Sequence, residues 1–132
     1  MIKYSSDRAK QRAELMHSKC ISINIEMLYY CESYGMPYTV TETVTTEKED
    51  MALKRVSASH REGRAWDIRT RDWPEWFLKQ FLEYFTLLYG HIGAMSSSDG
   101  KRKFMVDKSK TTRPHIHCQL DRTYARAIPW RH

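Results

Sequence analysis

Cysteine is scarce in this sequence, and its spacing argues against two classes of protein. The cysteines are Cys20, Cys31 and Cys118, and no pair has the Cys-x-x-Cys spacing. Their odd number speaks against a disulfide framework, and the missing spacing speaks against a zinc site built from cysteine. We therefore expect the three thiols to be reduced and to pack in the core.

Long apolar stretches are also missing. No run approaches the roughly 20 apolar residues of a membrane-spanning helix, and the opening residues, MIKYSSDRAKQR, turn polar too early for an export signal. The 132 residues contain no repeat, low-complexity tract or linker. The sequence therefore predicts one domain over residues 1–132 that is cytoplasmic at synthesis, monomeric and not inserted into membranes.

Acidic residues are fewer than basic ones: the sequence has 16 Asp and Glu and 22 Lys and Arg, so its net charge is +6. Such an excess favours an anionic partner, for example an acidic cell-wall polymer, a nucleic acid or a membrane surface, and it equally fits an ordinary basic protein. The basic residues do not line up along one predicted element, and no nucleic-acid-binding motif occurs. We therefore expect no nucleic-acid partner.

The first third of the sequence predicts a long helical region, a strand and a short helix. Residues 5–35 carry apolar side chains at helical spacing and end at Gly35. The β-branched stretch 38–46 predicts a strand. Thr46 and Glu49 form a capping box, which would open a short helix that runs to about residue 54.

Strands around one aromatic helix are predicted for the rest of the chain. In the segment 64–69, Trp66 and Ile68 would share one face of a strand, and Asp67 would lie on the other. The further elements expected are a helix started by Asp72 and Glu75 and ended by Gly90, a hairpin over 91–107 with its turn at Asp99 and Gly100, and a strand over 115–120. This order predicts an α+β fold with a central, mainly antiparallel sheet flanked by helices.

Aromatic side chains recur at helical spacing in the expected helix. They predict an apolar stripe that packs against the core rather than a ligand site. The stripe consists of Phe77, Phe81, Tyr84, Phe85 and Leu88.

The last predicted strand carries two histidines on one face. His115 and His117 lie two positions apart, so they project together, while Ile116 and Cys118 face the core. Adjacent imidazoles that are buried each need a polar partner. Zinc is a suitable partner, because it accepts imidazole nitrogen and carboxylate oxygen as ligands.

A second motif, SASHREGRAWDIRTRDW at residues 57–73, supplies complementary groups. His60 lies in a predicted loop, and Asp67 shares a strand face with Ala65, whose small side chain leaves room for a metal ion. His60, Asp67 and one histidine of the distal pair would provide three ligands. Three protein ligands and one open position are typical of a catalytic zinc site, whereas structural sites are usually closed by four.

Together the two motifs resemble the zinc peptidases of bacterial cell-wall peptides. This family includes D-alanyl-D-alanine carboxypeptidases and dipeptidases, and phage endolysins that cut the L-alanyl-D-glutamate bond. Its pattern is His, two residues, Gly, one residue, Ala, one residue, Asp, and then a distal His-x-His. The matching positions here are His60, Gly63, Ala65, Asp67, His115 and His117.

The resemblance implies a fold, a metal site and an activity. The fold would be of the Hedgehog/DD-peptidase type, with zinc bound by His60, Asp67 and His117. His115 would lie beside the metal and assist hydrolysis of a bond in a peptidoglycan stem peptide, after the protein has been released from the cytoplasm to the wall. Zinc would polarise the carbonyl and lower the pKa of a bound water toward ~7, and Asp107 is a weaker candidate than His115 for the base.

Basic residues near the expected site offer a further function. Arg64, Arg69 and Arg113 could hold a peptide carboxylate or stabilise an oxyanion.

Three departures from the family pattern leave a non-catalytic alternative open. Many members have Ser where this chain has Ala58, and many have an Arg in the region that corresponds to residues 44–46. Some have a catalytic Glu where this chain has Pro114. A zinc-binding virion or wall-binding protein without turnover is therefore the alternative.

A lower alternative comes from HIHCQL at residues 115–120, which also resembles the histidine-triad nucleotide hydrolases and transferases. In that interpretation His117 would attack a phosphate, Gln119 would take the third polar position, and no metal would be needed. It leaves His60 and Asp67 without a role.

Overall fold

A mixed five-stranded sheet forms the centre of the protein in the computed structural model, which describes residues 2–55, 57–96 and 99–124. The strand order is β1-β2-β3-β7-β6, and β1 and β2 are parallel while the other pairs are antiparallel. The predicted α+β class and mainly antiparallel sheet are therefore confirmed. The strands are β1 (Lys3–Tyr4), β2 (Thr39–Glu42), β3 (Ala65–Arg69), β6 (Met105–Lys108) and β7 (His115–Gln119).

Four α-helices surround the sheet within the described residues. They are α1 (Asp7–Arg12), α2 (Ser18–Ser33), α3 (Glu47–Ala52) and α4 (Glu75–Tyr89). Short 3-10 turns, η1 (Ala13–Leu15) and η2 (Gly90–Ile92), follow α1 and α4. The predicted hairpin forms in a shorter version from β4 (Ala94–Met95) and β5 (Arg102–Lys103), and Gly100 in its turn has a φ of +68°. Residues 105–107, which were expected in the hairpin, belong to β6 and pair with β7 in the main sheet.

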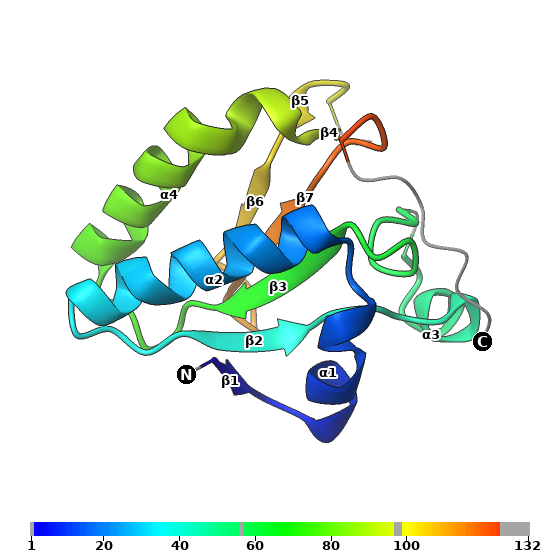
Figure 1. Ribbon diagram of the computed structural model, residues 1–132, viewed down its shortest axis with the longest axis horizontal. Helices are drawn as coiled ribbons and strands as arrows, with labels where there is room; N and C mark the ends of the chain where they lie inside the picture. The colour runs from blue at the N-terminus through cyan, green and yellow to red at the C-terminus, as the bar shows by residue number, and fades with distance from the viewer. Residues whose placement is uncertain (1, 56, 97–98, 125–132) are drawn as a thin grey trace.

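One face of the sheet is covered by the long helices α2 and α4 (Figure 1). The expected alternation along β3 is confirmed, because Trp66 and Ile68 are fully buried in the core on this side. Ile116 and Cys118 of β7 join them. Since neighbouring side chains of a strand point to opposite faces, the residues between them lie on the other face of the sheet.

All three cysteines are buried and free, as expected. Burial raises the pKa of Cys20 and of Cys31 to about 12, because the thiolate would lose its hydration. These thiols therefore act as small apolar core groups.

Neighbouring side chains cap the starts of α1 and α3, and the capping box expected for α3 is confirmed. Ser6 accepts a hydrogen bond from the backbone N–H of Ala9 and caps α1. The capping box of α3 is complete, because Thr46 accepts from the Glu49 N–H and the Glu49 carboxylate accepts from the Thr46 N–H.

Two predictions about the helices are wrong in detail. The long N-terminal helix is broken between η1 and α2, where Met16 is extended and packs in the core, and the backbone N–H of His17 donates to the Gly63 carbonyl at 2.7 Å. The aromatic helix begins at Glu75 behind Pro74, rather than at Asp72.

The stripe of the aromatic helix is narrower than expected. Phe77, Phe81 and Phe85 are buried, but Tyr84 and Leu88 are 44% and 40% exposed. They lie at the margin of the face that packs on the core. Among the residues that the structure describes, no helix has the length and apolarity to cross a bilayer.

Candidate metal centre

The pairing of β3 with β7 places the candidate ligands side by side. Asp67 is paired directly with His117, and Arg69 is paired with His115. Directly paired residues point to the same face of a sheet, so all four lie on the face opposite α2 and α4. The register thus joins two motifs that are 50 residues apart in the sequence.

A tight turn before β3 supplies the third side chain. Backbone hydrogen bonds from Gly63 to His60 and from Arg64 to Ser59 close the turn. Gly63 has a φ of +75°, a conformation that glycine adopts without strain. The turn brings His60 over the sheet next to Asp67, while Ala65 adds no bulk beyond its methyl group.

His60, Asp67 and His117 form a compact cluster that could bind a metal ion. One ligand atom from each lies within 4.8 Å of the other two. His60 and Asp67 are only 3% and 6% exposed. Two imidazole nitrogens and a carboxylate oxygen are a donor set that suits a divalent transition metal.

The hydrogen bonds of His60 show which of its nitrogens is available. Nδ1 lies 2.7 Å from the backbone carbonyl of Thr43. A carbonyl can only accept, so Nδ1 must carry a proton and donate it. In the neutral ring, the lone pair of Nε2 therefore faces Oδ1 of Asp67, at 3.1 Å.

His117 has the same arrangement with its nitrogens exchanged. Its Nε2 lies 3.0 Å from Oε1 of Gln119, whose own amide nitrogen donates to the Lys103 carbonyl at 3.1 Å. Gln119 thus presents an acceptor, and His117 donates from Nε2. The lone pair of Nδ1 then faces the same Asp67 oxygen, at 2.8 Å.

Three electron-pair donors therefore converge on one point with outer partners that fix their orientation. Neutral imidazole nitrogens and a carboxylate oxygen at these distances repel one another unless a cation is shared between them. A metal ion can bind all three donor atoms at once and so removes the repulsion between them. A proton can be shared by only one pair of these atoms at a time. The residues present therefore fit a metal ion.

The electrostatics of the cluster agree with this geometry. Burial disfavours the charged form of Asp67, but the charges and hydrogen bonds of His60 and His117 hold its pKa well below the usual range. Burial also acts against protonation of His60, yet Asp67 outweighs it and the pKa of His60 is raised. Burial dominates at His117, and His60 repels a second proton, so the pKa of His117 is lowered. The pocket thus accommodates one extra positive charge between its histidines.

His115 lies beside the cluster on the same strand face, about 7 Å along β7 from His117 at two-residue spacing. Its Nδ1 lies 2.6 Å from the Arg113 carbonyl and therefore donates. In the neutral ring Nε2 keeps its lone pair and can accept a proton. His115 is half-buried and lines a cleft of about 720 Å³ that also reaches Asp67.

Two other sequence-based candidates lie elsewhere. Asp107 pairs with Ile116, so it projects to the opposite face of the sheet and cannot serve the cluster as a base. Arg64 is 7% exposed, and its guanidinium is held by Glu62 and by the Leu120 carbonyl. Arg64 therefore supports the turn of the cluster, whereas Arg69 and Arg113 do line the cleft.

Sequence reasoning missed the groups that orient the ligands. The Thr43 carbonyl could not be predicted, because every residue has a backbone carbonyl and the side-chain pattern does not indicate which one contacts His60. Gln119 does leave a signal, because it stands two positions after His117 and so shares its strand face. Glu42 was also missed; it is paired with Asp67 across β2 and β3 and lines the cleft.

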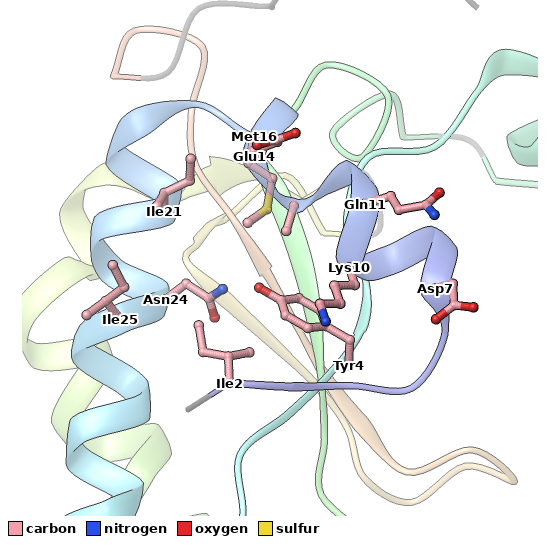
Figure 2. Close-up of a pocket in the computed structure, with 11 residues that line it drawn as sticks. Ile2, Tyr4, Asp7, Lys10, Gln11, Glu14, Met16, Ile21, Asn24 and Ile25 are labelled. Carbon is pink, nitrogen blue, oxygen red and sulfur yellow. The ribbon is translucent and has the colours of Figure 1, made fainter.

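A second hollow of about 800 Å³ lies between α1, η1 and α2, and is mainly apolar (Figure 2). Tyr4 and Ile2 border it on one side, and Asn24 and Ile25 of α2 border it on the other. It contains none of the residues of the metal cluster.

Comparison with known proteins gives no match for this chain among protein families, curated proteins or solved structures.

Proposed function

We propose that this protein is a zinc-dependent peptidase that hydrolyses a peptide bond in the stem peptides of bacterial peptidoglycan. The observation that carries the proposal is the convergence of His60, Asp67 and His117 on one point. The outer hydrogen bonds of both histidines leave them ready to bind a cation. The choice of zinc as the metal and of a wall peptide as the substrate is supported by the resemblance of the two sequence motifs to wall-peptide peptidases.

The architecture agrees with a Hedgehog/DD-peptidase-like fold, which we include in the proposal. An antiparallel pair of strands carries the ligands, and helices cover the other face of the sheet. A monomeric enzyme of this kind would reach the cell wall after release from the cytoplasm.

Each residue of the site has a distinct role in this reaction. His60, Asp67 and His117 would hold the zinc ion. Once bound, zinc would supply a Lewis acid for a peptide carbonyl and would acidify a water molecule. His115 accepts a proton at Nε2 and returns it to the leaving amine, while its Nδ1–H keeps the ring oriented against the Arg113 carbonyl.

The test combines metal content with product analysis. Purified protein is assayed for bound zinc and is then incubated with peptidoglycan, and mass spectrometry identifies new amino termini or free D-alanine. We expect stoichiometric zinc and one type of cleaved bond. His60→Ala should lose zinc and activity together.

A substitution at the proposed base separates chemistry from metal binding. His115→Gln should keep the zinc and lose 10²–10⁴-fold in kcat, which is the usual contribution of a general base. His91→Gln is the matched control, because His91 is exposed on η2 and is not part of the cleft. Active protein without zinc, or full activity in His60→Ala, would refute the assignment.

One observation favours a second candidate, a zinc-binding wall or virion protein without turnover. Apart from Asp67, the described carboxylates that line the cleft are those of Glu42 and Glu49, and both are held by Arg8. Proton transfer then depends on His115 alone. Bound zinc with no released product in the same assay would favour this candidate.

A further inference from the structure

The hollow between α1, η1 and α2 has a polar group at its floor that the fold leaves without a partner. Asn24 of α2 lines the hollow and is only 2% exposed. Its side-chain oxygen accepts a hydrogen bond from the Tyr38 hydroxyl in the core. Its amide nitrogen, Nδ2, makes no hydrogen bond within the described part of the chain. A buried donor without an acceptor is costly, and a molecule that enters the hollow can supply the acceptor.

A second donor lines the same hollow. Tyr4 of β1 is half-buried there, and its hydroxyl has no hydrogen-bond partner among the residues that the structure describes. In Figure 2 the Asn24 amide and the Tyr4 hydroxyl point toward one another from the two sides of the hollow. Two donors that face the same space suit an oxygen atom with two lone pairs, such as a carbonyl oxygen.

The remaining wall is apolar and elongated. Met16, Ile21 and Ile25 line the hollow. A neighbouring hollow of about 760 Å³ shares Ile25 with it and continues to Leu28 and Tyr29. The two hollows together form a groove along β1 and α2, in which Ile25 is 40% exposed and Tyr29 is 66% exposed. An aliphatic chain in this groove would cover apolar surface that otherwise contacts water.

The charges at the mouth of the groove favour an uncharged ligand. Asp7, Lys10 and Glu14 line the hollow and are exposed, so two carboxylates stand against one ammonium group. A ligand carboxylate would be repelled by this excess of negative charge, and it would lose its hydration next to Asn24. A neutral carbonyl group meets neither penalty.

We propose that this groove binds a small uncharged molecule with an aliphatic chain and a carbonyl oxygen, and that Asn24 and Tyr4 donate hydrogen bonds to that oxygen. The site goes beyond the proposed peptidase function, because the hollow that contains Asn24 shares no lining residue with the cleft beside the metal cluster. Binding is therefore expected to be the same with and without zinc.

The experiment titrates two ketones of different length, methyl propyl ketone and methyl heptyl ketone, into the isotope-labelled full chain. A ketone can accept a hydrogen bond and cannot donate one. The side-chain amide of Asn24 gives its own NMR signals, which should shift and saturate with both ketones. The four additional methylene groups, half to fully buried, should tighten binding by about 10- to 200-fold. Octanoate, which has the size of the longer ketone, should bind more weakly because of its charge.

Substitutions separate the hydrogen bond from the contact with the chain. Asn24→Leu is combined with Tyr38→Phe, so that no buried partner is left unpaired, and is compared with Tyr38→Phe alone. Loss of the amide should weaken both ketones by the same factor, roughly 2- to 12-fold. Ile25→Ser should instead reduce the effect of chain length. Leu87→Ser is the matched control, because Leu87 is 83% exposed on α4 and does not line the groove.

The melting temperature of every variant verifies that it is folded. The absence of a saturable shift in the Asn24 signals would overturn the site and would indicate that this amide donates only to water. Equal affinity in the double variant and in Tyr38→Phe would overturn the role of Asn24. Tighter binding of octanoate than of the longer ketone would overturn the assignment of an uncharged ligand.

Discussion

Replacing Asp67 with asparagine should remove most of the rise in melting temperature that zinc causes, without unfolding the protein. In the structure, one carboxylate oxygen of Asp67 faces two imidazole nitrogens, at 3.1 Å from His60 and 2.8 Å from His117. An asparagine amide can donate a hydrogen bond to one of these nitrogens and so relieves the conflict between acceptors. We therefore expect metal-free Asp67→Asn to melt within a few degrees of the unmodified protein.

The size of the zinc response can be calculated. Zinc at 100 times its dissociation constant stabilises the folded state by about 2.7 kcal/mol. For 132 residues at about 2.1 cal/mol/K each, the unfolding entropy is about 280 cal/mol/K, so the melting temperature rises by about 10 °C. Loss of a group that only hydrogen-bonds to a metal ligand weakens metal binding about 10- to 100-fold. Loss of the anionic ligand Asp67 should weaken zinc binding by more than this. The melting temperature should then rise by about 1.5 °C or less at the same zinc concentration.

Differential scanning calorimetry with and without zinc measures this rise. Asp107→Asn is the matched control, because Asp107 is exposed on the opposite face of the same sheet. The control should keep the full rise of about 10 °C. A rise of more than about 5 °C in Asp67→Asn, or loss of the rise in Asp107→Asn, would refute the ligand assignment.

Three further predictions concern the support of the cluster and of the fold. Gln119→Leu removes the acceptor that orients His117, so zinc affinity measured by chelator competition should fall about 10- to 100-fold. Gln119→Glu keeps an acceptor and should keep the zinc affinity. An unchanged zinc affinity in the leucine variant would contradict the orienting role of Gln119. Because the pKa of His60 is raised above 6.5, the stability that its protonated form contributes is present below pH 6.5 and is lost as pH rises through the raised pKa. Zinc must displace the proton of His60, so zinc affinity should weaken as pH falls through the same range. Titration calorimetry in two buffers of different ionisation enthalpy should detect the released proton. A zinc affinity that is constant between about pH 8 and 6 would contradict binding at His60. In Gly93→Ala the new Cβ would lie 2.2 Å from the backbone nitrogen of Phe104. The loss of stability should therefore exceed the roughly 1–3 kcal/mol that is usual for overpacking. Thermal denaturation followed by circular dichroism should show that the melting temperature falls by at least about 10 °C.

Features that depend on neighbouring residues could be predicted well. The capping box of Thr46 and Glu49 forms within four residues, and the alternation of Trp66, Asp67 and Ile68 follows from the period of a strand. Both signals are local, and no distant part of the chain competes with them.

Predictions failed where distant residues decided the outcome. The long N-terminal helix is interrupted at Met16, which packs in the core, and at His17, which bonds to Gly63. Helical periodicity in the sequence carries no information about a hydrogen bond to a turn 46 positions away. The aromatic helix starts late for a similar reason, since the ring nitrogen of Trp73 donates to the Pro37 carbonyl and holds the preceding turn.

The set of candidate ligands was determined by the sequence itself, because a strand has a period of two and an alternating segment must place Asp67 opposite the core. Which histidine of the distal pair joins the cluster was decided by the tertiary structure, through the register that pairs Asp67 with His117 and Arg69 with His115. The tertiary structure also decided which nitrogens face inward, through the Thr43 carbonyl and the Gln119 amide. Strand register and hydrogen-bond direction arise from contacts between distant segments, and such contacts exist only once the chain has folded.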